Sequence, residues 1–253
     1  WGVYTCANVA DYDAATTVNN KLNECVAMCD DIIKSNQFNL DDAYRKKFLY
    51  NNGAHIKDFI YAMPYDKVSA QGLKYGQYRT FRKVDGGDSM GYLGGKMNKS
   101  CAGICAMNEE FANLYTLPGD DRNDIILGAT TDGKVYIHDP LTGEPTANPY
   151  IYKGEQLVLS KKIQLKDDSE TARQQLDCGA TPKGWSQGYR SLKFYPNPNE
   201  YASYERNQSN DVPIFRYADI ILTKAEALLR GAQKTNDDTP QSLLNQIRSY
   251  VHA

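Results

Sequence analysis

The chain has 253 residues, of which 41% are hydrophobic and 24% are charged, the usual balance of a globular protein. Its formal net charge is −2, so no overall positive field exists to hold a polyanion, which argues against nucleic acid as a partner. No run of about 18 apolar residues occurs, so no segment is predicted to span a membrane as a helix.

Tyrosine is the most informative residue type, with 19 tyrosines against 7 phenylalanines and 2 tryptophans. A tyrosine ring has a flat apolar face and a polar hydroxyl, which suits hydrated surfaces that bind other molecules. The same residues can equally pack inside loop-rich layers. The composition therefore allows a binding surface without locating it.

Six cysteines are present, and two of them, Cys25 and Cys29, are four residues apart. On a helix this spacing places them on one face, where we expect small buried hydrophobic side chains. The three histidines lie far from the cysteines in sequence, so we predict neither a metal site nor a cofactor. Disulfides remain an alternative, with a connectivity that the sequence does not provide.

The first third of the chain begins with helical periodicity. Apolar residues recur every three or four positions over residues 13–35, which predicts an amphipathic helix. A short second helix is expected within residues 41–50, and the apolar, aromatic segment 58–66 is predicted to be a strand. Residues 67–100 are rich in glycine and tyrosine and are predicted to form a long loop region.

The middle of the chain alternates between short elements. Residues 108–115 are predicted to be helical, and strand-like segments follow at residues 124–129, 134–138 and 155–160. The segment DGK at 132–134 predicts a hairpin turn between two of these strands. Prolines then interrupt the chain up to about residue 210.

The sharpest local pattern lies in residues 210–232. Asp211 is expected to cap a helix, Pro213 to lie in its first turn, and Gly231 to end it. Its inner face is predicted from an apolar stripe made of Phe215, Ala218, Leu222, Ala225 and Leu229. A further helix is expected from residues 237–240 onward, and its inner face is predicted to carry Leu244, Ile247 and Val251. The two helices together predict a tetratricopeptide-like pair.

The segment DVPIFRYADIILTKAEALLR resembles the hallmark helix of the SusD/RagB family. The matching positions are Asp211, Pro213, Arg216, Tyr217, Ala218, Asp219, Leu222, Ala225 and Glu226. Further segments agree with the family in the expected order: VYTCANVADYDAA, FIYAMPYD, NEEFANLYTLPGDDR, YRSLKFYPNP and LLNQIRSYVHA. Two departures are Asp58, where glutamate is usual, and Tyr250, where arginine is usual.

The resemblance implies a mainly α, SusD-like fold, with tetratricopeptide-like helices packed with a loop-rich region that carries short strands. Residues 1–57 would be a helical part, 58–209 the loop-rich part and 210–253 a helical hairpin, all within one domain. The chain would lack the N-terminal portion and the extreme C-terminus of a longer lipoprotein. That protein would be lipid-anchored at the cell surface, on the outer membrane, and would pass glycans to a SusC-like TonB-dependent transporter.

The polar motifs do not predict an enzyme. Catalysis would need a nucleophile with a base, paired carboxylates or a metal cluster. The acidic pairs at 120–121 and 167–168 are typical of solvated turns, and no HExxH, GxSxG or P-loop motif is present. Arg216, Asp219 and Glu226 are interpreted as structural residues of the hallmark helix.

Sugar rings stack on aromatic side chains, so the candidate ligand-binding residues come from aromatic loops. These candidates are Tyr65, Tyr75, Tyr78, Arg79, Tyr92 and Trp185. The alternative for each is packing within a loop layer. Two other functions remain open: a member of the same fold that binds peptides or proteins, and a helical-repeat scaffold for docking.

Overall fold

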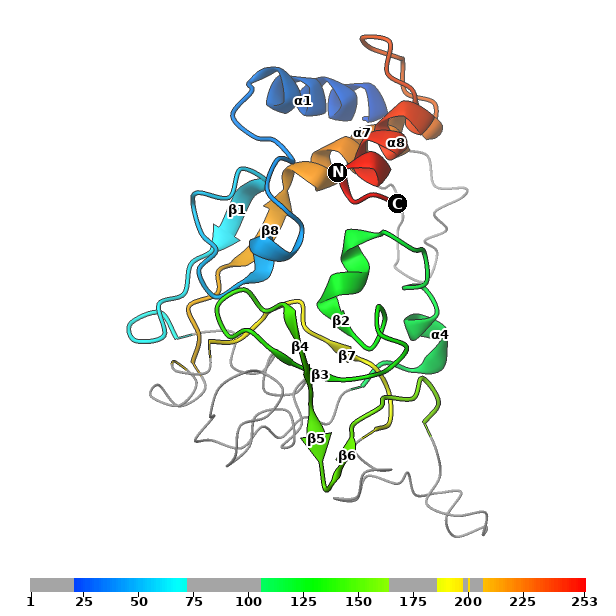
Figure 1. Cartoon of the computed structure of the whole chain (residues 1–253). Helices are drawn as coiled ribbons and strands as arrows, with labels where there is room; N and C mark the ends of the chain where they lie inside the picture. Colours follow the sequence, from blue (N-terminus) through cyan, green and yellow to red (C-terminus); the bar gives the residue numbers. More distant parts are fainter. Residues whose placement is uncertain (1–20, 72–105, 164–185, 198–199, 201–206) are drawn as a thin grey trace, which may run out of the picture. The chain divides into compact units, whose positions relative to one another are not determined.

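The computed structural model describes residues 21–71, 106–163, 186–197, 200 and 207–253 (Figure 1). The chain divides into two compact units. The first unit comprises Trp1–Asp42, Ala54–Ala62 and Pro213–His252, and the second comprises Ala43–Gly53 and Met63–Val212, with Ala253. Among the described residues, every helix is too short or too polar to cross a membrane.

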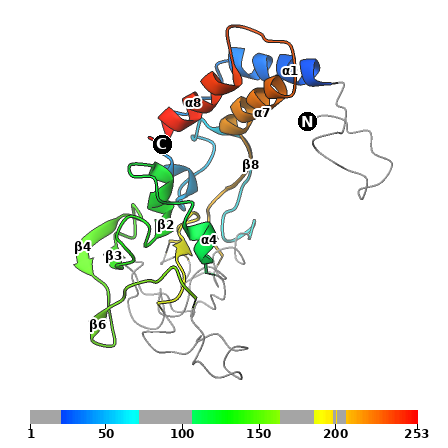
Figure 2. The same ribbon diagram turned by 90° about the vertical axis from the view of Figure 1, so that its right-hand side faces the viewer.

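Three helices dominate the first unit: α1 (Leu22–Lys34), α7 (Tyr217–Leu229) and α8 (Pro240–Tyr250). Helix α7 contacts both others, and Figures 1 and 2 show α1 and α8 lying beside it. The buried core of this unit contains Leu40, Tyr217, Ala218, Ile221, Ala225 and Leu243. Helix α1 lies within the predicted segment 13–35, of which residues 13–20 are outside the described residues, and two helices follow at the C-terminal end as predicted.

The start of α7 differs from the prediction. Residues Val212–Arg216 are extended and form strand β8, which pairs with β1 (Phe59–Met63). Asp211 and Pro213 therefore precede the helix and do not belong to its first turn. Asp219 caps the helix instead, because its carboxylate accepts the Arg216 N–H at 2.9 Å.

Buried Asp58, directly before β1, supports the same helix end. Its carboxylate accepts the backbone N–H of Ala218 at 3.1 Å and lies 3.3 Å from the guanidinium of Arg216. A carboxylate at a helix N-terminus also interacts favourably with the helix dipole. The interpretation of Arg216 and Asp219 as structural residues fits these contacts.

The buried face of α7 is shifted from the predicted stripe. Ala218 and Ala225 are buried, as expected, whereas Leu222 is 38% exposed and Leu229 76% exposed, and Phe215 lies in β8. The packed face contains Lys224, which hydropathy places outside a core. Its charge is neutralised there, because its Nζ lies 2.5 Å from both Asp30 of α1 and Asp238.

The ends of the helical pair follow the predicted pattern more closely. Gly231, just past the end of α7, has φ +101°, a left-handed conformation that glycine adopts without strain. Thr239 caps α8 through a hydrogen bond from the Ser242 N–H. Val251 is buried as predicted, but Leu244 is 43% exposed, and its neighbour Leu243 is buried in its place.

The second unit is built from short elements. The helical segments are η2 (Arg45–Phe48), α4 (Glu109–Ala112) and η3 (Asp121–Ile125). The strands are β2 (Ile126–Leu127), β3 (Tyr136–His138), β4 (Pro145–Pro149), β5 (Ile151–Tyr152), β6 (Glu155–Gln156) and β7 (Arg190–Ser191). The helices predicted at 41–50 and 108–115 are thus present in shortened form, the first as a 3-10 helix.

The strand pairing corrects one prediction. Strands β2 and β3 do not form a hairpin, because β2 pairs with β7, β3 with β4, and β5 with β6. Asp132 and Gly133 do adopt the positive φ values of a tight turn, 50° and 80°. The turn is present, but the strands on either side of it find partners elsewhere.

The core of the second unit contains Ile125, Ile126, Leu127, Val135, Leu157, Leu159 and Leu192, together with Tyr150, Tyr189 and Tyr195. Buried amide side chains join its loops. Asn210 donates to the carbonyl oxygens of Phe48 and Tyr195, and Asn52 donates to that of Asp211. Such bonds satisfy backbone groups that no strand reaches, which lets a loop-rich region keep a defined shape.

Candidate functional site

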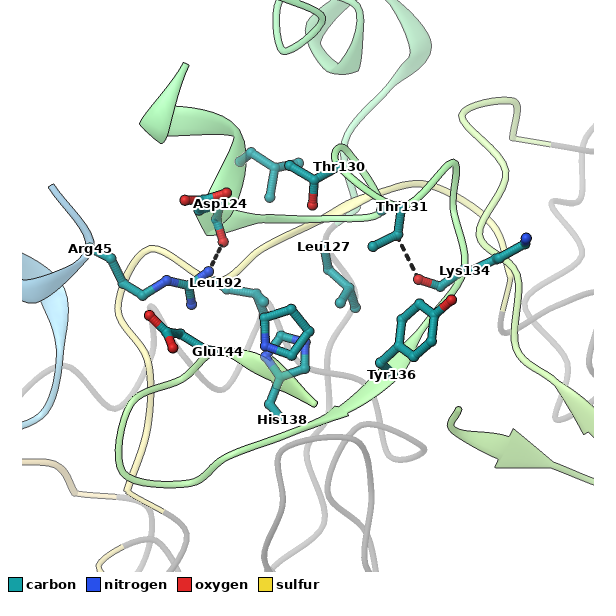
Figure 3. A pocket seen from close by; sticks show the side chains of 13 residues that line it. Arg45, Asp124, Leu127, Thr130, Thr131, Lys134, Tyr136, His138, Glu144 and Leu192 are labelled. Carbon is teal, nitrogen blue, oxygen red and sulfur yellow. Dashed lines mark hydrogen bonds between the residues drawn. The ribbon is translucent and has the colours of Figure 1, made fainter. Parts of the chain in front are cut away.

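A pocket of about 260 Å³ lies within the second unit (Figure 3). In Figure 3, Arg45, Asp124 and Glu144 lie on one side and Thr131, Lys134 and Tyr136 on the other, with Leu127 and Leu192 between them. The remaining lining residues are Ile126, Gly128, Thr130, His138 and Pro145. The pocket therefore combines an apolar middle with two polar walls.

Arg45 organises the first polar wall, which we call the acidic wall. It extends from η2, and its two terminal nitrogens donate to the carbonyl oxygens of Gly143 and Asp124. These bonds tie η2 to η3 and to the loop before β4. The carboxylates of Asp124 and Glu144 line the pocket beside this guanidinium.

The acidic wall shifts the ionisation of its own members. Desolvation raises the pKa of Asp124 above its usual value, and the negative charges of Asp121, Glu144 and Asp120 act in the same direction. The positive charge of Arg45 opposes this rise but does not cancel it. The rise in the pKa of Asp124 therefore comes first from its burial, and the neighbouring carboxylates add to it.

His138 lies beneath this wall, at the end of β3. Its ring is buried, its Nδ1 donates to the Gly143 carbonyl at 3.0 Å, and it stacks on Tyr195 with ring centroids 6.0 Å apart. Burial, followed by the nearby charge of Arg45, lowers the pKa of His138 to about 4. The imidazole is therefore neutral at neutral pH.

The opposite wall, which we call the hydroxyl wall, is set by the turn between β2 and β3. Thr131 donates its hydroxyl to the Lys134 carbonyl at 2.6 Å. Gly133 has φ +80°, and a Cβ added there would lie 2.2 Å from the Leu159 carbonyl oxygen. Only glycine fits this close approach, which holds the turn, and with it Thr131 and Lys134, in place.

This arrangement can bind a polar ligand. Hydroxyls, carboxylates and an apolar middle can engage a polyol through hydrogen bonds and C–H contacts. Among the described residues, no group of three or more His, Cys, Asp or Glu side chains is placed to hold a metal ion.

Of the candidate ligand residues predicted from sequence, Tyr75, Tyr78, Arg79, Tyr92 and Trp185 lie outside the described residues. Tyr65 is described: it is half-buried, and its N–H donates to the carboxylate of Asp211 at 3.1 Å. It does not line the pocket.

The pocket residues themselves were not predicted from the sequence. One signal was available, because Tyr136 and His138 alternate within the predicted strand 134–138 and therefore share a face. Arg45 carries no comparable signal. It is 79 residues from Asp124, and only the folded chain brings the two together.

A second hollow, of about 350 Å³, lies in the first unit and is lined by apolar side chains and the cysteines of α1. Cys29 is buried, as predicted, and Cys25 is partly buried. Burial, with the adjacent Cys25, raises the pKa of Cys29 to about 12. This hollow has the character of a packing surface.

Comparisons with known proteins identify the fold. A comparison with curated proteins found no match. Among solved structures, the chain is similar to a SusD superfamily protein from Parabacteroides distasonis, with 17% identity and a TM-score of 0.53 over 91% of this chain and 39% of that one. It is equally similar to surface glycan-binding protein A from Bacteroides thetaiotaomicron in complex with laminarihexaose, with 17% identity and a TM-score of 0.53 over 91% and 43% of the two chains.

The corresponding protein from Bacteroides fluxus gives 18% identity and a TM-score of 0.53 over 92% of this chain and 40% of that one. The chain thus spans about two-fifths of the length of these structures. The likeness confirms the SusD-like fold predicted from the sequence. The family model described as the SusD family matches residues 57–250. The chain belongs to the SusD family.

Proposed function

We propose that this chain binds glycans at the bacterial cell surface without altering them chemically. The observation that carries the proposal is membership of the SusD family, joined to a similar solved structure that holds laminarihexaose. The pocket of the second unit supports it, because its walls offer donors and acceptors around an apolar middle. A volume of about 260 Å³ suits a single sugar ring.

We propose further sugar contacts from the aromatic loops. Tyr65, Tyr75, Tyr78, Tyr92 and Trp185 offer ring faces for stacking, and Arg79 offers hydrogen-bond donors. These residues would add contacts along an oligosaccharide chain. Their role rests on residue type and on their position in segments that the sequence predicts to be loops.

The remaining functional statements concern the whole protein. We propose that residues 1–253 form part of one SusD-like domain with tetratricopeptide-like helices, a proposal supported by the packing of α7 against α1 and α8. We also propose a lipid-anchored protein of the outer membrane that delivers its ligand to a SusC-like TonB-dependent transporter. These proposals rest on family membership.

Peptide binding is a second candidate. The fixed charges of the pocket favour it, because Arg45, Asp124 and Glu144 are suited to charged as well as neutral ligands. An acidic wall facing a hydroxyl wall also suits a ligand with one amino group. The two candidates therefore need to be tested side by side.

The test is an array that carries glycans and peptides together, probed with the labelled 253-residue chain. We expect binding to glycans of one class. Chromatography of the bound oligosaccharide after prolonged incubation is expected to recover it unchanged. Binding to peptides alone would overturn the glycan proposal, and new reducing ends would overturn the proposal of binding without chemistry.

A further inference from the structure

We propose that the pocket of the second unit selects sugars by charge, accepting neutral and amino sugars and excluding uronic acids. This inference rests on the proposed glycan binding and specifies its ligand class. It follows from the distribution of charge around the pocket and from the directions in which the charged side chains point (Figure 3).

The first step is that the acidic wall carries more negative than positive charge. Asp124 and Glu144 both line the pocket, and within the described residues no hydrogen bond or salt bridge reaches either carboxylate. Asp120, which lies nearby, is paired with Arg122 at 2.5 Å and adds no net charge.

The second step is that the cations around the pocket do not form an anion site. Arg45 directs one N–H of each terminal nitrogen at the carbonyl oxygens of Gly143 and Asp124, and its single positive charge is outnumbered by the two carboxylates of the acidic wall. His138 is neutral because its pKa is about 4. Lys134 contributes its backbone carbonyl to the hydroxyl wall, while its ammonium group points away from the pocket in Figure 3.

The third step applies this field to sugars. Hydroxyl groups of a neutral ring can donate to the carboxylates of Asp124 and Glu144, forming charge-assisted hydrogen bonds. An ammonium group on the ring gains an ionic attraction in addition. A carboxylate on the ring instead approaches two like charges, which disfavours its binding.

The experiment compares sugars that share a ring and differ in charge. Binding of glucose, glucosamine and glucuronic acid, and of the three corresponding galactose derivatives, is measured by saturation-transfer NMR at pH 7. We expect glucuronic or galacturonic acid to bind at least about fivefold more weakly than the neutral sugar of its series, the effect of one like charge at contact distance in water. The amino sugar is expected to bind at least as tightly as the neutral one.

The double variant Asp124→Asn, Glu144→Gln removes both charges and keeps the shape of both side chains. It is expected to bring the uronic acid within about twofold of the neutral sugar, since the repulsive charge is gone. The matched control is Glu110→Gln, Glu155→Gln, which removes two exposed carboxylates of the same unit outside the pocket. The control is expected to leave the order of affinities unchanged, and circular dichroism checks that both variants are folded.

The outcomes separate this inference from the proposed function. Equal affinity of the parent chain for neutral and uronic sugars would overturn charge selection while glycan binding stands. If a glycan from the array binds equally well to the parent chain and to the Asp124→Asn, Glu144→Gln variant, the sugar lies outside the pocket. That result would also overturn charge selection by the pocket. Absence of binding to every glycan would overturn both proposals.

Discussion

Replacing Lys224 with methionine is expected to destabilise the helical unit by about 3–5 kcal/mol, the typical effect of breaking a buried ion pair. Lys224 is fully buried on α7, and its Nζ lies 2.5 Å from the carboxylates of Asp30 and Asp238. Asp30 is 4% exposed, so the substitution leaves a buried carboxylate without its cation. Asp238 is one-third exposed and can be solvated, so most of the penalty comes from Asp30.

The measurement is urea denaturation followed by far-UV circular dichroism, which reports mainly on the helices. Lys234→Met is the matched control, because Lys234 is exposed and lies 3.8 Å from a fully exposed Asp237. For this control, the free energy of unfolding is expected to change by less than about 0.5 kcal/mol. The double variant Asp30→Leu, Lys224→Met removes both charges and is expected to recover most of the loss.

The pH dependence of this network follows from its pKa shifts. Burial alone would raise the pKa of Asp30, but the hydrogen bonds and positive charges around it, that of Lys224 first among them, together outweigh burial and hold the pKa below its usual value. Burial would lower the pKa of Lys224, but its bonds to Asp238 and Asp30 raise it. The stabilisation by Asp30 is therefore lost as pH falls below about 4, and that by Lys224 as pH rises above about 10.

The difference between parent and Lys224→Met is thus expected to be largest near neutral pH and to shrink below pH 4. A Lys224→Met variant as stable as the Lys234→Met control at pH 7 would refute this account of the α7 core.

Two further predictions concern ligand contacts and the pocket. Replacing Tyr92 and Trp185 together with alanine is expected to abolish glycan binding while the melting temperature stays nearly unchanged; unaltered binding in calorimetry would remove both residues from the site. Gly154→Ala is expected to destabilise the chain by ~1 kcal/mol, through left-handed backbone strain alone, because the space around Gly154 is open. Gly133→Ala is expected to destabilise the chain by more, because the new Cβ also meets the Leu159 carbonyl. Equal melting temperatures for the two glycine variants would show that this contact does not limit the turn.

The hydrophobic period of the sequence predicts α7 and α8 but not which side of α7 is buried. A stripe drawn through Leu222 and Leu229 is displaced from the packed face, since that face includes Lys224. A lysine becomes a core residue only when acidic partners meet it, and Asp30 comes from another helix 194 residues away. Hydropathy alone does not contain that information.

The same reasoning explains the start of α7. Asp211 and Pro213 are typical of a helix N-terminus, and local preference alone places the helix there. Pairing with β1, a strand more than a hundred residues earlier, draws this segment into an extended conformation instead. Non-local pairing overrides local preference at this point.

The candidate pocket is the least predictable feature. Its lining combines Arg45 and Asp124 from two 3-10 helices with residues from strands β2, β3 and β4 and from the loops that connect them. Loops follow no hydrophobic period, so their convergence depends on bonds such as those from Arg45 to Asp124 and Gly143. The resemblance to the SusD family, by contrast, can be recognised from the sequence alone, because the hallmark segment consists of contiguous residues.

The central claim is that this chain binds glycans, and titration calorimetry tests it most directly. The 253-residue chain, shown to be folded by circular dichroism, is titrated with the oligosaccharide that binds most strongly on the glycan array. We predict saturable binding with one ligand per chain. The double variant Asp124→Asn, Glu144→Gln is expected to bind an amino sugar with lower affinity than the parent chain, and a uronic acid with higher affinity. A folded chain that releases or absorbs no heat with any glycan, and that gives saturable binding with a peptide, would contradict it.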